Sequence, residues 1–257
     1  MAGMKGRSRQ RLDQRVVAEG LYPSREAARR AIMAGEVRIG DAPATKPGMW
    51  VLDDQAVRRV GEAMPWVSRG GYKLDHALGL WPIAVKDRVA VDVGASTGGF
   101  TDVLLQRGAA QVHAVDVGYG QLAWKLRQDP RVVVHERTNA RHLTPADLTG
   151  DGPPVTLAVM DVSFIGLAKV LPAVRTWLEA AMDAAVREVV ALVKPQFEVG
   201  PDRVGSRGVV REQAHREEAL EAVIRDAEAL GFVRKGVTTS PITGPEGNVE
   251  YLLWLAL

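Results

Sequence analysis

An apolar segment in the middle of the chain runs directly into a cluster of glycines. Val89–Val93 is expected to form a buried strand and residues 100–106 a helix. Between them lie Gly94, Gly98 and Gly99, which let the backbone approach a ligand closely near the start of the helix. The spacing differs from the G-x-G-x-x-G of dinucleotide folds, and no lysine follows it as in a P-loop. The loop indicates a nucleoside cofactor, with a purely structural strand-to-helix turn as the alternative.

Strands and helices alternate through the rest of the chain. Further strands are expected at residues 112–117, 132–135, 157–162 and 189–193, and helices at residues 121–127, 167–181 and 212–230. Near-continuously apolar strands separated by helices predict a parallel sheet that is covered on both faces. The last two strand-like segments, 232–239 and 249–257, are joined by a connection too short for a helical crossover. The last strand is therefore expected to run antiparallel.

Polar residues stand at the ends of two of these strands. Asp116 lies where a carboxylate can hold a ribose diol, the position that dinucleotide enzymes also use. Lys194 ends an apolar strand directly before Pro195, and a lysine is not a natural choice for a core position. Both residues strengthen the expectation of a ligand site at one edge of the sheet.

Charge is distributed unevenly along the chain. Residues 1–60 contain 12 Lys/Arg against 7 Asp/Glu, whereas the remainder holds 21 against 24. A basic module joined to a near-neutral body is expected for a protein that binds a polyanion and carries a separate catalytic unit. The alternative is a merely solvated basic surface.

Composition excludes several other classes of protein. There is no cysteine, and the five histidines show no ligand spacing, so no metal site is expected. The basic N-terminus is not followed by an apolar core, as a secretory signal requires. No apolar run approaches the ~18 residues of a membrane span. We expect a cytoplasmic protein with no membrane partner.

The basic module has two predicted helices. Leu12, Val16 and Val17 recur at helical spacing, and a second helix over Arg25–Met33 follows a Ser24 N-cap. Gly35 is expected to end that second helix. Arg25, Arg29 and Arg30 share one face of it and could contact phosphates. Short strands are expected at residues 37–41 and at Trp50–Leu52.

The pattern R-L-D-x-x-V…S-R-x-x-A-R-x-x-I-x-x-G-x-V-x-I over residues 10–57 resembles the alpha-L RNA-binding motif. That motif occurs in ribosomal protein S four, pseudouridine synthases and tyrosyl-tRNA synthetases. The resemblance implies a small α+β RNA-binding domain at residues 1–60 and a linker at 61–68. A helical hairpin with an incidental arginine face is the alternative. The candidate RNA-binding residues are Arg7, Arg9, Arg11, Arg25, Arg29, Arg30 and Arg69.

The rest of the chain resembles the TlyA/hemolysin A family, in which an alpha-L motif precedes an FtsJ-like methyltransferase domain. The resemblance rests on D-V-G-A-S-T-G-G-F, A-V-D-V-G-Y-G-Q-L-A-W, M-D-V-S-F-I, L-V-K-P-Q-F-E and N-V-E-Y, in this order. It implies a Rossmann-like α/β domain at residues 69–257, with a seven-stranded sheet whose last strand is antiparallel. It also implies S-adenosylmethionine as donor and 2′-O-methylation of cytidine in ribosomal RNA (16S and/or 23S), with ribosomal subunits as partners.

The same resemblance implies a catalytic tetrad of Lys73, Asp161, Lys194 and Glu250. Catalysis must align oxygen, methyl and sulfur in line and must remove or share the hydroxyl proton. A lysine is ordinarily protonated at neutral pH, so burial or a second cation such as Lys73 would be needed for Lys194 to act as a base. Asp161 and Glu250 would orient the lysines. Whether Lys194 takes the proton or only steers the hydroxyl stays open.

The candidate cofactor-binding residues are Asp92, Gly94, Ser96, Thr97, Gly98, Gly99, Phe100, Asp116, Asn139 and Asp161. One position departs from the family pattern. FtsJ-like enzymes commonly carry an acidic residue after the third strand to meet adenine, and this chain has Asn139 there. Its side-chain oxygen can still accept from the adenine amino group. The glycine- and arginine-rich loop at residues 198–211 is expected either to order on RNA or to be a mobile surface loop.

Three competing functions follow from the same residues. The first is an RNA-binding ribosome-assembly factor with a catalytically silent methyltransferase fold, against which the intact tetrad argues. The second is a membrane-lytic protein, which the absence of a signal, a spanning segment and a basic amphipathic helix disfavours. The third is a nicotinamide dehydrogenase, which would need the tighter dinucleotide fingerprint. Oligomeric state and the modified nucleotide are not encoded in these patterns.

Overall fold

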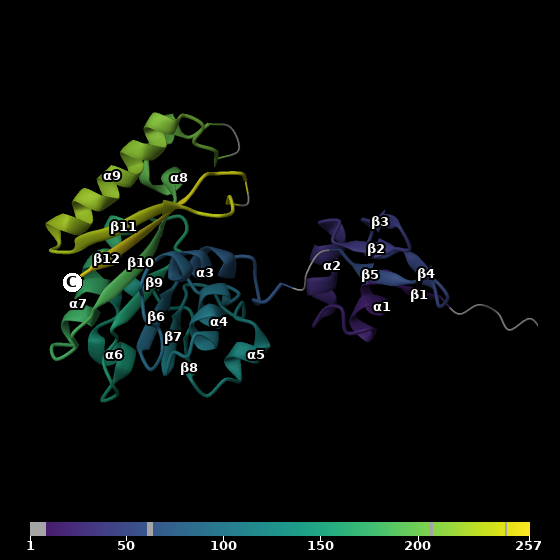
Figure 1. Ribbon diagram of the computed structural model, residues 1–257, viewed down its shortest axis with the longest axis horizontal. Coiled ribbons are helices and arrows are strands. Elements are labelled where there is room, and N and C mark those ends of the chain that lie inside the picture. Colours follow the sequence, from purple (N-terminus) through teal and green to yellow (C-terminus); the bar gives the residue numbers. More distant parts are fainter. Residues whose placement is uncertain (1–8, 61–63, 206–207, 245) are drawn as a thin grey trace, which may run out of the picture. The chain divides into compact units, whose positions relative to one another are not determined.

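The computed structural model describes residues 9–60, 64–205, 208–244 and 246–257 (Figure 1). The chain divides into two compact units, Met1–Pro65 and Trp66–Leu257. Arg7, a candidate RNA-binding residue, lies outside the described residues, as do residues 61–63 of the expected linker and 206–207 of the 198–211 loop.

The N-terminal unit has two helices and two small antiparallel sheets. The helices are α1 (Leu12–Ala18) and α2 (Arg25–Met33). One sheet pairs β1 (Arg9–Arg11) with β4 (Trp50–Leu52), and the other has the order β3 (Ala42–Ala44), β2 (Val37–Ile39), β5 (Val57–Arg59). The predicted helices and strands are confirmed. The strands β1, β3 and β5 were not predicted.

Local chemistry explains the limits of α2. The Ser24 hydroxyl accepts a hydrogen bond from the backbone N–H of Ala27 at 3.2 Å, which satisfies one of the free amides of the first turn. After Ala34, Gly35 adopts a φ of +77°, a left-handed conformation that ends the helix. Buried Leu12, Val16 and Ile32 join α1 and α2 in the small core of this unit.

The second unit is built on a seven-stranded sheet with the order β11-β12-β10-β9-β6-β7-β8. The strands are β6 (Val89–Val93), β7 (Gln111–Val115), β8 (Val132–His135), β9 (Leu157–Met160), β10 (Glu188–Val193), β11 (Val233–Thr239) and β12 (Tyr251–Ala256). The pairs between β10 and β8 are parallel, and β12 is antiparallel to both of its neighbours. The predicted seven-stranded sheet with an antiparallel last strand is confirmed.

Helices cover both faces of this sheet (Figure 1). One face packs against α3 (Gly71–Leu80), α4 (Gly99–Gln106) and α5 (Trp124–Arg127). The other packs against α6 (Pro145–Thr149), α7 (Leu171–Glu179) and α9 (Gln213–Ala229). Successive residues of β6 enter the two cores in turn, because side chains alternate between the faces of a strand. Val89, Val91 and Val93 belong to the core with α7, and Ala90 to the core with α4.

Several predicted boundaries were wrong in ways that matter for the site. The strands expected at 112–117 and 157–162 end at Val115 and Met160, so Asp116 and Asp161 follow the strands rather than lying inside them. The helix expected over 121–127 is only the single turn α5, and the one expected from 167 begins as a 3-10 turn (Leu167–Lys169) before α7. A proline in the first turn of α7 explains the delay, because proline fits a helix start and not its interior.

Two short helices were not predicted. Thr144 and Asp147 form a reciprocal capping box at the start of α6, which the S/T-x-x-D pattern could have indicated. The single turn α8 (Pro195–Glu198) directly follows β10.

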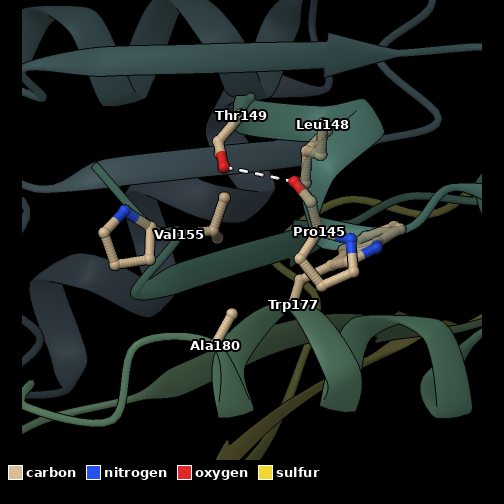
Figure 2. Close-up of a pocket in the computed structure, with 7 residues that line it drawn as sticks. Pro145, Leu148, Thr149, Val155, Trp177 and Ala180 are labelled. Atoms are coloured by element: carbon tan, nitrogen blue, oxygen red, sulfur yellow. Dashed lines mark hydrogen bonds between the residues drawn. The ribbon is translucent and has the colours of Figure 1, made fainter. Parts of the chain in front are cut away.

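The cavity between α6 and α7 belongs to the core and is not a ligand site (Figure 2). Its volume of about 10 Å³ has room for one water at most. Figure 2 shows the Thr149 hydroxyl donating to the Pro145 carbonyl oxygen, at 3.2 Å, on one wall of the cavity. Trp177 also lines the cavity, and its indole N–H donates to the Leu143 carbonyl oxygen at 2.8 Å.

Candidate active site

The four side chains of the predicted tetrad meet at one edge of the large sheet. Asp161 and Lys194 directly follow the parallel neighbours β9 and β10, and Glu250 directly precedes the antiparallel β12. The carboxyl ends of parallel strands share an edge with the start of an antiparallel neighbour, so the topology brings the three residues together. Lys73 reaches them from the first turn of α3.

Two ion pairs and a longer contact connect these residues. Lys194 Nζ lies 2.6 Å from Asp161 Oδ1, and Lys73 Nζ lies 2.6 Å from Glu250 Oε2. The other oxygen of Asp161, Oδ2, lies 3.9 Å from Lys73 Nζ, so this carboxylate lies between the two ammonium groups. The cluster contains two cations and two anions, which balances charges that are largely removed from water.

The tetrad is more deeply buried than the sequence indicates. Lys73 alone looks like a solvated helix lysine, yet it is buried, as is Lys194. The side chain of Glu250 is 1% exposed and that of Asp161 is 22% exposed. Asp161 is therefore the carboxylate that an incoming substrate can reach.

Three further residues next to Lys194 were not predicted as site residues. Lys194 Nζ donates to the Ser163 hydroxyl at 2.7 Å and lies 6.0 Å from the centre of the Phe197 ring. Phe164 packs on Phe197 with ring centres 5.2 Å apart, while the Phe164 side chain is 90% exposed. Its φ of +64° is a left-handed backbone conformation that is unusual for a bulky residue. The run M-D-V-S-F-I contains both Ser163 and Phe164, but neither the exposure nor the φ angle can be inferred from it.

The glycine loop after β6 packs tightly against the protein. Gly94 has a φ of +84°, and a Cβ there would come within 2.6 Å of the Asp161 carbonyl oxygen. A Cβ on Gly99 would overlap Ser68, and one on Gly98 would overlap Leu126. The glycines are therefore needed for packing as well as for any approach of a ligand. They hold the end of β6 directly beside the tetrad.

Asp92 is a fully buried carboxyl group at the end of β6. Its Oδ2 accepts from the backbone N–H of Thr101 at 2.9 Å and from the Thr101 hydroxyl at 2.7 Å. Its Oδ1 is buried without a hydrogen-bond donor among the described residues. Burial raises the pKa of Asp92 from 3.8 to about 7.

Asp116 joins the loops that follow β6 and β7. Its Oδ2 accepts from the backbone N–H of Ser96 at 2.8 Å, and its Oδ1 from that of Gly118 at 2.7 Å. Ser96 has a φ of +48°, so the carboxylate fixes a rare backbone conformation. The next residue, Val117, is 72% exposed. A carboxylate with spare lone pairs beside an exposed apolar side chain fits a ribose diol next to an adenine ring.

The other cofactor candidates differ in how well their side chains fit that role. Asn139 follows β8 at the same edge of the sheet, but its Oδ1 accepts from the backbone N–H and Nε of Arg141, at 3.2 Å each. Asn139 therefore caps a 3-10 turn, and any bond to adenine must share that oxygen. The Thr97 carbonyl oxygen accepts from the Ala123 N–H at 3.1 Å. Phe100 is buried in the core, so only its backbone faces the loop.

The candidate RNA-binding arginines differ in their contacts. Arg11 and Arg25 both donate to the carboxylate of buried Asp13, at 3.0–3.1 Å, and the bond from Arg11 is the largest cause of its lowered pKa. Arg30 pairs with Glu26 at 2.6 Å, whereas Arg29 has no ion pair in the described part of the chain. Arg9 lies over the Trp50 ring, 5.1 Å from its centre. Arg69, in the second unit, donates to the Thr243 carbonyl oxygen at 3.3 Å.

The described part of the 198–211 loop is attached to the segment before β12. Buried Asn248 accepts from the Val210 N–H at 3.0 Å and donates to the Gly208 carbonyl oxygen at 2.8 Å. Arg203 pairs with Glu218 of α9. Asn248 stands two residues before Glu250 in the chain, so these bonds attach Gly208 and Val210 to the segment that carries Glu250.

Two family models match this chain: FtsJ-like methyltransferase over residues 66–257 and S4 domain over residues 10–56. The 16S/23S rRNA (cytidine-2′-O)-methyltransferase TlyA of Mycobacterium tuberculosis is 54% identical over 96% of this chain and 90% of its own length. Hemolysin A of Brachyspira hyodysenteriae is 38% identical over 94% of this chain and 98% of its own. A solved structure from Streptococcus thermophilus, described as a suspected hemolysin, is 44% identical. It has a TM-score of 0.75 and covers 96% of this chain and 88% of that one.

The hemolysin names bear on the membrane-lytic alternative. Among the residues that the structure describes, none of the helices has the length and apolar character needed to cross a membrane. The family models and the relatives agree with each other and with the observed fold. The chain therefore belongs to the TlyA/hemolysin A family of FtsJ-like methyltransferases with an N-terminal S4 domain.

Proposed function

We propose that this protein transfers the methyl group of S-adenosylmethionine to the ribose 2′-hydroxyl of a cytidine in ribosomal RNA, 16S and/or 23S, in the cytoplasm. The observation that carries the proposal is the position of Lys194. Its ammonium group lies between Asp161 and Ser163 at the edge of the sheet and beside Phe197. The named activity of the mycobacterial relative is the same reaction.

Lys194 is suited to orienting the hydroxyl. An ammonium group has three N–H donors, and Asp161 and Ser163 accept two of them. The third donates to the 2′-oxygen and directs its remaining lone pair at the methyl carbon. An ammonium that donates in this way has no lone pair of its own, so the more exposed Asp161 receives the hydroxyl proton. Glu250 holds Lys73, and Lys73 in turn faces the second oxygen of Asp161.

The cofactor candidates that follow β6 and β7 would hold the donor. S-adenosylmethionine, when bound, supplies an electrophilic methyl group on a sulfonium. Asp116 would accept from the ribose hydroxyls and Val117 would contact the adenine. Gly94, Ser96, Thr97, Gly98 and Gly99 would contact the methionine moiety through their backbone. The unpartnered Oδ1 of Asp92 offers a buried acceptor nearby. Asn139 would meet the adenine amino group.

The two units would have different functions, one in RNA binding and the other in catalysis. We assign residues 1–60 to RNA binding, residues 61–68 to the linker and residues 69–257 to catalysis. Ribosomal subunits are the proposed partners, and the basic balance of residues 1–60 suits their phosphate backbone.

The decisive experiment measures methyl transfer into ribosomal subunits from methyl-labelled S-adenosylmethionine. We expect label in rRNA at an alkali-resistant linkage, and a loss of about 10²-fold in rate for Lys194→Ala, because the hydroxyl is no longer oriented. The matched control is Lys86→Ala, which removes an exposed lysine and should retain full activity. Tight binding to subunits without any transfer would instead support the catalytically silent assembly factor.

A further inference from the structure

The outer face of the β1–β4 ribbon carries an exposed tryptophan between arginines. In this ribbon Arg9 pairs with Leu52 and Arg11 pairs with Trp50. Val51 is fully buried in the core of the unit, so its neighbours on the strand project to the opposite side. Trp50 is 57% exposed on that side. An indole of that size in water contributes little to this small core.

One arginine lies over the indole, and a second stands directly across the ribbon from it. The guanidinium carbon of Arg9 lies 5.1 Å from the ring centre, within the range of a cation–π contact. Arg11, directly across the ribbon from Trp50, is held by two bonds of 3.1 Å to Asp13. Asp13 is fully buried and also accepts from Arg25, so it fixes two cations on this side of the unit. Two arginines share the single carboxylate of Asp13, so cations are in excess here.

This arrangement matches the requirements of single-stranded RNA. An unpaired base offers a π-face that stacks on an aromatic side chain, and guanidinium groups next to it bind the flanking phosphates. A duplex hides its base faces and offers only phosphates and groove edges. Tryptophan and arginine are also common in protein–protein contacts, so the surplus of cations in residues 1–60 is what favours RNA here.

We propose that Trp50, with Arg9 and Arg11, stacks one unpaired base of the RNA substrate. The inference rests on RNA as the partner in the proposed function, but it concerns the N-terminal unit and does not involve the tetrad. Arg9 covers one face of the indole, and the base occupies the other face or replaces Arg9. The S4 domain then contributes a preference for unpaired nucleotides in addition to attraction by charge.

The test uses the full-length protein and a fluorescein-labelled single-stranded RNA, alone or annealed to its complement, without a methyl donor. Trp50→Ala should weaken binding of the single strand by about 5- to 100-fold, as expected for the loss of one stacked base. Binding of the duplex should change by less than about 2-fold, because a paired base has no free face to stack. The slope of affinity against salt should stay the same, because no cation is lost. Trp50→Phe should keep most of the affinity.

Matched variants separate stacking from other effects. Val60→Ala removes another exposed apolar side chain of the same unit, outside α2 and the β1–β4 ribbon, and should bind RNA normally. An unchanged affinity of Trp50→Ala, or an equal loss on single strand and duplex, would overturn the proposal. So would a loss seen with intact subunits but not with RNA alone, which would indicate a protein partner. Because no donor is present, a failure here is distinct from a failure of methyl transfer.

Discussion

Phe164 combines two features that are individually costly. It exposes nearly its whole side chain to water and holds a left-handed backbone conformation, which costs an L-residue about 1–2 kcal/mol. Its ring packs on Phe197, and Phe197 in turn lies beside Lys194. Strain of this kind persists where the function needs the side chain in that place. We therefore assign Phe164 to contact with the base of the target nucleotide, which must leave its stack before it can react.

Variants of Phe164 should change RNA binding and the free energy of unfolding in different ways. Phe164→Ala is expected to raise the KM for RNA by about 5- to 100-fold, the effect of losing one base stack, while the Kd for S-adenosylmethionine stays unchanged. Phe164→Tyr should restore most of the affinity. Phe164→Gly should relieve the backbone strain and raise the free energy of unfolding by about 1 kcal/mol despite weaker RNA binding. A lower stability for the glycine variant would contradict the role of strain.

At the scale of elements, the neighbouring strands β7 and β8 share a pair of stacked histidines. His113 Nδ1 lies 3.1 Å from His135 Nε2, and the ring centres are 5.4 Å apart. Burial, with a smaller contribution from His135, lowers the pKa of His113 from 6.5 to about 4, and burial also lowers the pKa of His135. Below pH 6.5 His113 becomes protonated in the unfolded chain, whereas in the folded chain it stays neutral until the pH approaches 4. The free energy of unfolding should therefore fall as the pH drops from 6.5 to 4.

Replacing His113 should make the free energy of unfolding depend less on pH between 6.5 and 4. We expect His113 to account for at most about 3 kcal/mol of the loss between pH 6.5 and 4, less any solvent screening. Asp92, with its pKa raised to about 7, acts in the opposite direction over the same range. The contribution of His113 is therefore the difference in urea unfolding between the unmodified protein and His113→Gln. His76→Gln, at an exposed position, is the control and should leave the slope unchanged.

At the scale of the whole molecule, the proposed function places RNA attraction and cofactor binding in different units. Arg29 is the cleanest test of this separation, because it has no ion pair within the described residues, whereas Arg25 also neutralises buried Asp13. Arg29→Ala combined with Arg30→Ala should weaken RNA binding and lower the slope of log K against log salt by about 0.7–0.9 for each lost phosphate contact. Calorimetry should show an unchanged Kd for S-adenosylmethionine. An equal loss of cofactor binding would refute the division between the units, and Arg175→Ala on α7 serves as the charge control.

Much of the fold follows from local patterns. Apolar runs between helices predict the parallel sheet, the short connection before β12 predicts its reversed direction, and Ser24 marks the start of α2. The sheet edge shared by Asp161, Lys194 and Glu250 follows from these elements, because residues at the carboxyl ends of parallel strands are brought together by topology. The roles of these three residues came from a family resemblance and not from spacing. The short helices were missed or misplaced, because single turns show no period.

Other properties depend on contacts between distant parts of the chain. Lys73 and Glu250 are 177 positions apart, and only their pairing explains why a lysine on a short helix is buried. The burial of Asp13, the backbone strain at Phe164 and the guanidinium over Trp50 likewise require the assembled structure. The sequence by itself determined which strands and helices form and at which edge the polar residues emerge, because hydrophobic periodicity and capping act over a few residues. Only the tertiary structure decided which charges are buried and paired, because burial and ion pairing are set by side chains that meet across the fold.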